Sequence, residues 1–173
     1  MKTQLPHDEL IARAKRIAMV LSDNDGVLTD NTVFVSEVGE ELKQYSFRDG
    51  MGVERLRNAG VQTAIVTREK SAIVRRRAEK LQLPFVWEGV RDKREQLQKI
   101  LVEARLGADQ LAYIGDDVND LGIIEAIAPA GLTAAPSDAM PEVREAVHYV
   151  CECPGGRGAF RDFAEWILRL RTE

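Results

Sequence analysis

The chain has 173 residues, of which 45% are hydrophobic, and its formal net charge is −4 at pH 7. This length and hydrophobic content suit one domain with a buried core, so we expect a single domain over residues 1–173. A net negative chain has no basic surplus to neutralise a phosphate backbone, which argues against nucleic-acid binding. The apolar run at 17–21 is too short for a signal-peptide core or a membrane span, so we expect a soluble, cytoplasmic protein with no membrane partner.

The chain contains two cysteines, Cys151 and Cys153, which are separated by one residue. A disulfide between residues this close would be strained, and a zinc site with four ligands lacks its other partners. We therefore expect both side chains to be ordinary thiols.

Short runs of Val, Ile and Leu alternate with longer segments of helical period, which is typical of β-α units around a parallel sheet. Apolar residues recur at helical spacing before Pro84 and before Gly107, and a last amphipathic helix carries Phe160, Phe163 and Ile167 on one face. The pattern predicts an α/β fold with a doubly wound, Rossmann-like parallel sheet. The expected strands cover residues 18–21, 61–66, 85–87, 111–114 and 130–134.

One segment interrupts this alternation. Residues 32–35 and 41–47 are rich in β-formers and flank the sequence Glu-Val-Gly-Glu at 37–40, so we expect a β-hairpin inserted after the first strand, at about 32–47. The glycine-rich stretch at 155–158 predicts a turn or a mobile hinge before the last helix. No internal repeat, low-complexity tract or linker indicates a second domain, and we expect no cap domain.

Polar side chains follow the predicted strands. In an open α/β sheet, ligands bind beyond the carboxyl ends of the strands, where the loops of several strands meet. We therefore expect the residues of four loops to share one edge of the sheet. They are Asp23 and Asp25 after the first strand, Thr67 and Arg68 after the second, Lys93 after the third, and Asp116, Asp117 and Asp120 after the fourth.

Asp23 and Asp25 lie two residues apart and are followed by Gly26, so both carboxylates can face the same crevice. One ionised carboxylate can attack phosphorus while the other donates a proton to the leaving oxygen. Asp116 would join them in an oxygen site for Mg²⁺, the cation that offsets repulsion between carboxylates and a substrate phosphate. This pattern predicts a Mg²⁺-dependent phosphatase with Asp23 as the nucleophile and Asp25 as the acid.

Thr67 and Lys93 would complete the site, because a hydroxyl can bind a phosphoryl oxygen and an ammonium can stabilise charge on the nucleophile and the transferring group. We expect Asp117 and Asp120 behind the metal ligands, with Asp120 capping or orienting its loop. Each feature alone has a simpler explanation: D-x-D-G is common in turns and calcium loops, Thr67 could cap a helix, and Lys93 could lie in solvent. An EF-hand does not fit, because the chain lacks the further calcium ligands at the required spacing and the terminal Glu of an EF-hand loop. Four such loops in a consistent order favour the catalytic interpretation.

With these four loops in order, the chain resembles the haloacid dehalogenase (HAD) superfamily, and within it the capless phosphatases that act on 2-keto-3-deoxy sugar acids. The resemblance covers nearly the whole chain. The sequence DNDGVLTD, which begins at Asp23, is similar to the first motif of the superfamily, and Thr67, Lys93 and Asp116 match the second, third and fourth motifs. The resemblance implies that an aspartyl-phosphate forms on Asp23, and that Asp25 is the general acid and offers its backbone carbonyl to Mg²⁺.

Two narrower resemblances point to different sugar acids. RDGMG at 48–52 and GGRGAFRD at 155–162 are similar to segments of 3-deoxy-D-manno-octulosonate 8-phosphate phosphatases, which implies that Arg48 contacts the substrate. TREKSAIVRRRAEKL, which begins at Thr67, resembles phosphatases of nine-carbon (sialic-acid-type) keto-acid 9-phosphates. Their sugar contacts would fall on Glu69, Arg77 and Lys80 in this chain, for which a solvated charged face is the alternative.

The chain departs from the family at Arg68, because glycine usually follows the motif-two threonine. An arginine there could crowd the phosphate pocket or donate hydrogen bonds to the substrate, and both interpretations remain open. The departure bears on the identity of the substrate more than on the chemistry.

The small capless members of the superfamily that this chain resembles form tetramers. In these tetramers the inserted hairpin and a neighbour's C-terminal segment cover the active site. The resemblance therefore implies a homotetramer with the hairpin at 32–47 in its interface and Arg157 as a substrate contact in trans. A flexible turn is the alternative for the segment around Arg157. Assembly would also exclude bulk water from the phosphoryl transfer of a chain that has no cap.

Three other functions compete with a sugar-acid phosphatase. A non-catalytic HAD-like interaction or regulatory domain has no need for Asp23, Asp25, Lys93 and Asp116 together. A receiver-like phosphoacceptor also uses carboxylates, Mg²⁺, Thr and Lys at strand ends, but the acid two residues from the nucleophile favours turnover over storage. A phosphatase of other small sugar phosphates would keep the same chemistry with a different substrate.

Overall fold

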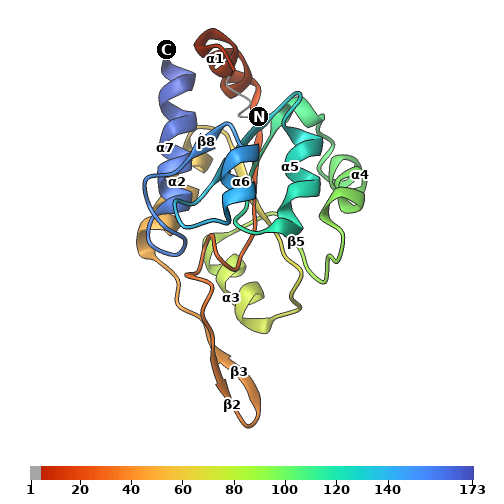
Figure 1. Cartoon of the computed structure of the whole chain (residues 1–173), viewed down its shortest axis with the longest axis vertical. Helices are drawn as coiled ribbons and strands as arrows, with labels where there is room; N and C mark the ends of the chain where they lie inside the picture. Colours follow the sequence, from red (N-terminus) through yellow and green to blue (C-terminus); the bar gives the residue numbers. More distant parts are fainter. Residues whose placement is uncertain (1–4) are drawn as a thin grey trace.

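The computed structural model describes residues 5–173. Six parallel strands form one sheet in the order β5-β4-β1-β6-β7-β8, and helices cover both faces of the sheet (Figure 1). From β1 the chain builds β4 and β5 on one side and then crosses over to build β6, β7 and β8 on the other. The predicted doubly wound α/β sheet is therefore confirmed. The strands are β1 (Met19–Ser22), β4 (Gln62–Val66), β5 (Val86–Trp87), β6 (Leu111–Ile114), β7 (Leu132–Ala135) and β8 (Tyr149–Val150).

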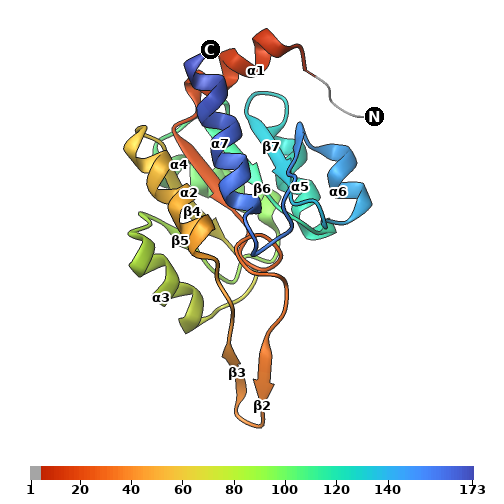
Figure 2. The same ribbon diagram turned by 90° about the vertical axis from the view of Figure 1, so that its left-hand side faces the viewer.

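Different helices cover the two faces of the sheet (Figure 2). Side chains alternate between the faces of a strand, so Val20 packs in one apolar cluster while Met19 and Leu21 pack in the other. The helices on the Val20 face are α1 (His7–Arg16), α2 (Phe47–Asn58), α3 (Ala72–Leu81) and α7 (Ala159–Thr172), and those on the opposite face are α4 (Lys93–Ala104), α5 (Leu121–Ile127) and α6 (Pro141–Ala146).

The five predicted strands and the three helices with a clear apolar period, α3, α4 and α7, are confirmed, with small shifts at their ends. The strand β8 and the helices α1, α2, α5 and α6 are not among the elements that the sequence predicted. Two residues are too few for β8 to show a pattern, and Gly50 and Gly52 interrupt the helical signal of α2. None of the helices in residues 5–173 is both long and apolar enough to cross a membrane.

The inserted hairpin consists of β2 (Phe34–Ser36) and β3 (Gly39–Leu42), which project from the body of the protein (Figures 1 and 2). The expectation of a second strand at 41–47 is wrong at both ends. The chain reverses early because Gly39 adopts a positive φ of 119°, and Phe47 already begins α2 because the Ser46 hydroxyl accepts a hydrogen bond from the Arg48 N–H. No cap domain is present within residues 5–173.

The glycine-rich stretch at 155–158 is a turn, as predicted, and it is held against the rest of the protein. The Gly155 N–H donates to the Asp138 carboxylate at 2.9 Å, and the Gly156 N–H donates to the Val27 carbonyl at 2.8 Å. A side chain on Gly156 would collide with the backbone of Thr29, so the turn and the loop after β1 pack in close contact. The hinge alternative is therefore not supported. Cys151 and Cys153 are free thiols, as expected.

Candidate active site

The carboxyl edge of the sheet brings the predicted loops together. Ser22, the last residue of β1, pairs with Ile65 of β4 and with Ile114 of β6, so the loops that follow these strands begin at the same level. A cavity of about 400 Å³ opens at this edge. Its lining residues are Asp23, Asp25, Asn31, Thr67, Arg68, Glu69, Asp116, Asp117, Val118 and Asn119.

Lys93 links the loops after β1 and β6 beneath this cavity. Its ammonium lies 2.9 Å from Asp23 Oδ2 and 2.6 Å from Asp120 Oδ1, and its side chain is only 1% exposed. Burial by itself would lower the pKa of Lys93, but the carboxylates of Asp23 and Asp120 outweigh that effect, so its pKa lies above the ordinary value. Lys93 therefore carries a buried positive charge against Asp23. It is the first residue of α4, whose N-cap, Asp92, accepts a hydrogen bond from the Glu95 N–H at 3.0 Å.

Asp120 organises the loop after β6. One of its oxygens accepts from Lys93 Nζ and from the Tyr113 hydroxyl at 2.7 Å, and the other accepts from the N–H groups of Asp116 at 2.9 Å and Asp117 at 3.3 Å. Asp120 lies close enough to Asp23 and Asp116 for a shared ion, but four donors already occupy its two oxygens. The geometry therefore suits a supporting position for Asp120. The Asp117 carboxylate accepts from the N–H of Val118 at 2.7 Å and caps the short helix η2 (Val118–Asp120).

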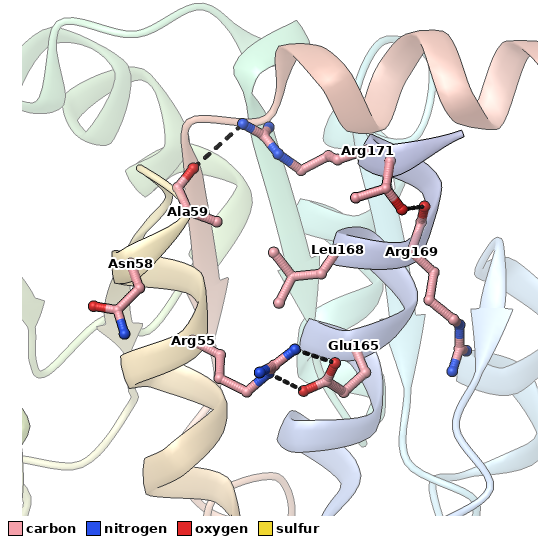
Figure 3. A pocket seen from close by; sticks show the side chains of 8 residues that line it. Arg55, Asn58, Ala59, Glu165, Leu168, Arg169 and Arg171 are labelled. Carbon is pink, nitrogen blue, oxygen red and sulfur yellow. Dashed lines mark hydrogen bonds and ion pairs between the residues drawn. The ribbon is translucent and has the colours of Figure 1, made fainter.

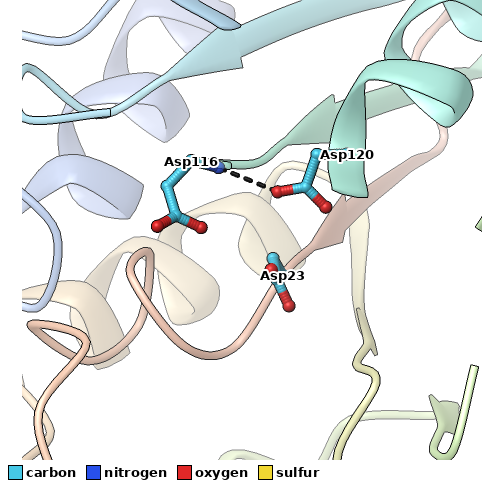
Figure 4. Close-up of side chains that lie close together, drawn as sticks. All are labelled: Asp23, Asp116 and Asp120. Carbon is cyan, nitrogen blue, oxygen red and sulfur yellow. Dashed lines mark hydrogen bonds between the residues drawn. The ribbon is translucent and has the colours of Figure 1, made fainter. Parts of the chain in front are cut away.

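Asp23 and Asp116 approach each other from the loops after β1 and β6 (Figure 4). Among the described residues, no group donates a hydrogen bond to the Asp116 carboxylate. Burial, together with the charges of Asp23 and Asp120, raises the pKa of Asp116 to about 8. Burial also raises the pKa of Asp23 to about 7, although Lys93 opposes the rise. Two buried carboxylates that face each other need more positive charge than Lys93 supplies, and hard oxygen donors of this kind fit Mg²⁺.

Gly26 makes this approach possible. It has a positive φ of 86°, and a side chain at this position would overlap the Asp116 carboxylate. The loop after β1 can therefore turn tightly under Asp116 only with glycine at position 26.

Asp25 lies at the edge of the cavity, and the side chains of residues 5–173 that donate to its carboxylate all reach the same oxygen. Oδ1 accepts from Lys43 Nζ at 2.6 Å, from Asn24 Nδ2 at 3.1 Å and from the Thr29 hydroxyl at 3.4 Å. Sequence reasoning missed Lys43, which lies just after β3 and whose side chain is only 4% exposed. A lysine in a charged hairpin gives no local signal that its side chain is buried.

Thr67 follows β4 and is buried beside the cavity. Its N–H donates to the Trp87 carbonyl at 2.9 Å, and its hydroxyl oxygen accepts from the Glu69 N–H at 3.2 Å. Within the described part of the chain, the Thr67 hydroxyl hydrogen has no acceptor, so it is available to a bound phosphoryl oxygen. Arg68 and Glu69 are exposed at the rim of the cavity, and Arg68 makes no ion pair or hydrogen bond with any residue from 5 to 173.

The other predicted substrate contacts do not line this cavity. The Arg77 guanidinium donates to the Ser46 carbonyl at 2.9 Å and lies over the ring of Tyr45, and the Lys80 ammonium lies 5.6 Å from the ring centroid of Phe47. Arg48 and Arg157 are exposed. Substrate contacts by Arg48, Arg77, Lys80 and Arg157 stay predictions. Such a contact would need either a rearrangement of this chain or a second copy of it.

A larger cavity of about 570 Å³ lies between α2 and α7 (Figure 3). It is lined by the C-terminal parts of both helices, which places it at the amino edge of the sheet. Three of its four charged side chains are already bonded to the protein: Arg55 pairs with Glu165, and Arg171 donates to the carbonyls of Ala14 and Ile17 at 2.9 Å. It also lacks the cluster of carboxylates that lines the smaller cavity. We therefore place the active site at the smaller, acidic cavity.

The comparisons with known proteins agree with this geometry. No protein-family model matches the chain. A 3-deoxy-D-manno-octulosonate 8-phosphate phosphatase of Yersinia pestis is 35% identical over 161 residues, which cover 93% of this chain and 84% of the relative. A HAD-superfamily hydrolase structure from Legionella pneumophila is 39% identical, with a TM-score of 0.88 over 95% of this chain and 89% of the other. The phosphatase of Moraxella catarrhalis, solved with magnesium, phosphate and KDO, is 32% identical, with a TM-score of 0.87 over 95% and 93% of the two chains.

The parallel sheet, the absence of a cap among the described residues and the acidic edge are those of a phosphatase of the HAD superfamily. Within it, the chain belongs to the family of 3-deoxy-D-manno-octulosonate 8-phosphate phosphatases, which are phosphoric monoester hydrolases. The superfamily and the narrower resemblance predicted from RDGMG and GGRGAFRD are both confirmed.

Proposed function

We propose that this chain hydrolyses the phosphate monoester of a small sugar acid through an aspartyl-phosphate on Asp23. The observation that carries the proposal is the position of Asp23, whose Oδ2 lies 2.9 Å from the buried Lys93 ammonium at the floor of an acidic cavity. Lys93 holds the nucleophile and offsets its charge as a phosphate approaches. A purely structural domain has no need for a buried lysine beside a cavity that opens to solvent.

Asp23 attacks phosphorus, the bond from phosphorus to the leaving oxygen breaks, and Asp25 gives that oxygen a proton. Asp25 then takes a proton from the water that hydrolyses the aspartyl-phosphate, and inorganic phosphate leaves. Thr67 orients a phosphoryl oxygen through its hydroxyl. Mg²⁺ would be held by the carboxylates of Asp23 and Asp116 and the backbone carbonyl of Asp25, and it supplies charge neutralisation between these carboxylates and the phosphate.

The proposed substrate is 3-deoxy-D-manno-octulosonate 8-phosphate. The names of the relatives support this, as does the Moraxella catarrhalis enzyme, which was solved with KDO and phosphate. Nine-carbon keto-acid 9-phosphates are the second candidate, because the segment from Thr67 resembles their phosphatases. At the rim of the cavity, Arg68 is in position to pair with the carboxylate of either substrate, and Glu69 could accept hydrogen bonds from sugar hydroxyl groups.

A phosphate-release assay with Mg²⁺ tests this function. It compares the eight-carbon acid 8-phosphate, nine-carbon acid 9-phosphates and simple hexose phosphates. We expect the eight-carbon acid to have the highest kcat/KM, and a preference for the nine-carbon acids would change the substrate and keep the reaction. Borohydride reduction of the quenched enzyme should convert a phosphorylated Asp23 to homoserine, which mass spectrometry detects. Release of phosphate with no modification of Asp23 would exclude the covalent mechanism.

We further propose that residues 1–173 form one domain that assembles as a homotetramer through the hairpin. The support is an exposed apolar surface on the hairpin, of a kind that a monomer rarely presents to water. Light scattering of the wild-type protein and of Val38→Asp tests the assembly, and a monomer in both would exclude it. The exposed apolar residues are Phe34 (65% exposed), Val35 (70%), Val38 (81%) and Leu42 (62%).

A further inference from the structure

The segment that returns from the hairpin to the body of the protein contacts the loop after β1. This return arm, residues 43–46, lies between β3 and α2. Lys43 and Tyr45 are turned inward and Gln44 is exposed, as expected for an extended chain in which alternate side chains face the same way. The side chain of Lys43 is only 4% exposed, although much of the hairpin surface beside it is open to solvent. An ammonium is buried to this extent only where a specific partner compensates for the lost water.

That partner is Asp25, the proposed acid and base. The Lys43 ammonium lies 2.6 Å from Asp25 Oδ1, whereas the nearest oxygen of Glu40 is 3.8 Å away, so Asp25 is the closer of its two acidic neighbours. Asn24 Nδ2 and the Thr29 hydroxyl also donate to Oδ1. Within the described residues, Asp25 Oδ2 has no hydrogen-bond partner. The three donors therefore hold Oδ1 in place and leave Oδ2 without a hydrogen bond to any residue from 5 to 173.

Tyr45 acts on the same carboxyl group through Asn24. Its hydroxyl donates to Asn24 Oδ1 at 3.1 Å, which turns the amide nitrogen of Asn24 toward Asp25. Arg77 of α3 holds this part of the arm, because its guanidinium lies 5.2 Å from the centroid of the Tyr45 ring and donates to the Ser46 carbonyl. The arm is thus fixed to the body on one side and to the acid on the other.

We propose that Lys43 is a positioning residue that holds Asp25 by Oδ1, so that Oδ2 is the oxygen that gives the proton to the leaving group. The hairpin is then part of the catalytic unit of its own chain, in addition to any role in assembly. This inference rests on the proposed phosphatase function and adds to it the residue that orients the acid. Proton transfer requires the acid to be placed within hydrogen-bond reach of the leaving oxygen, so a freely rotating Asp25 would protonate it less often.

The test uses the leaving group. Lys43→Met is compared with the wild-type enzyme on the sugar-acid phosphate, whose alkoxide needs a proton, and on 2,4-dinitrophenyl phosphate, whose phenolate leaves without one. The measured quantity is kcat/KM, because it reports the steps up to the aspartyl-phosphate and leaves out its hydrolysis. We expect a loss of about 10- to 100-fold on the sugar-acid phosphate, a part of the usual contribution of a general acid, and a change of less than about threefold on the aryl phosphate.

Three further variants make the outcome decisive. Lys43→Arg keeps the charge and should retain most of the activity. Lys99→Met removes a lysine of α4 whose side chain is 63% exposed, and it should leave kcat/KM unchanged for both substrates. Tyr45→Phe should cause a smaller loss in the same direction as Lys43→Met, and it decides the matter if Lys43→Met does not fold. Equal losses on both substrates would overturn the inference. A higher KM for the sugar-acid phosphate with an unchanged kcat would also overturn it. No turnover by the wild-type enzyme would instead reject the proposed function.

Discussion

Asp49 accepts a hydrogen bond from the backbone N–H of Arg161 at 3.0 Å, and so it caps the first turn of α7 from within α2. Its other oxygen accepts from the Gly158 N–H at 3.2 Å. The two runs that resemble the family most narrowly, at 48–52 and 155–162, are therefore bonded to each other. Gly52 belongs to the same contact, because a side chain there would press on the backbone of Arg161. Part of this sequence signal thus reflects the packing of α2 against α7.

Replacing Asp49 by Asn should destabilise the fold. Asp49 is 1% exposed, and an amide keeps one acceptor oxygen but turns its NH₂ group toward a backbone N–H that would lose its partner. We expect a loss of about 1–3 kcal/mol in the free energy of unfolding, measured by urea denaturation. Glu54→Gln, on the exposed side of the same helix, is the control and should change the stability little. Equal stability of Asp49→Asn and the wild type would show that the cap is dispensable.

Asp23→Asn should abolish turnover and leave the fold intact. The change is nearly isosteric, but an amide is a poor nucleophile, so we expect a fall in kcat of about 10³-fold or more. Phosphate release measures the activity, and circular dichroism checks the fold. Activity near that of the wild type would reject Asp23 as the nucleophile.

The stability of the Mg²⁺-free protein should decrease as the pH rises from 5.5 to 8.5. The folded protein holds the pKa of Asp23 at about 7 and that of Asp116 at about 8, above their ordinary values near 4. The unfolded chain therefore ionises first, and the stability contributed by these groups is lost as the pH rises through the folded-state pKa values. Thermal unfolding at several pH values measures this, and saturating Mg²⁺ should flatten the curve. A Tm that rises with pH without Mg²⁺ would contradict it.

Asp116→Asn separates stability from function. Removing one of two facing carboxylates relieves the charge repulsion, so we expect the Mg²⁺-free variant to unfold at a Tm about 2–8 °C higher than the wild type at pH 8, which corresponds to roughly 1–2 kcal/mol. The same variant should lose both activity and the increase in Tm that Mg²⁺ gives to the wild type. A variant that is still stabilised by Mg²⁺ as strongly as the wild type would remove Asp116 from the metal site.

Arg68→Gly tests the residue that departs from the family pattern. The Arg68 guanidinium lines the cavity and has no acidic partner within residues 5–173, so its charge is available to an anionic substrate. We expect KM for the sugar-acid phosphate to rise about 5- to 10-fold, with a smaller rise for an aryl phosphate that has no carboxylate. Lys70→Ala, a neighbouring exposed cation outside this cavity, is the control. A lower KM for Arg68→Gly would show that the arginine crowds the pocket.

The sequence by itself determined five of the six strands of the sheet and the residues at its carboxyl edge. Asp23 and Thr67 could be placed because each directly follows an apolar run, and Lys93 because it lies in the loop region after the third run; the strands of a parallel sheet end at a common edge. Asp116 follows from the same rule, since β6 ends two residues before it. These positions depend only on periodicity and on local chain direction, and both can be recognised from neighbouring residues in the sequence.

Only the tertiary structure decided the contacts between residues far apart in the chain. The burial of Lys43 against Asp25, 18 residues away, depends on where the hairpin bends back, and the cap from Asp49 to Arg161 spans 112 residues. Likewise, the sequence predicts Asp120 behind the metal ligands, but only the fold shows the four donors that its two oxygens accept from. Such contacts depend on how whole elements pack, and packing is a property of the assembled core that no local pattern of residues contains.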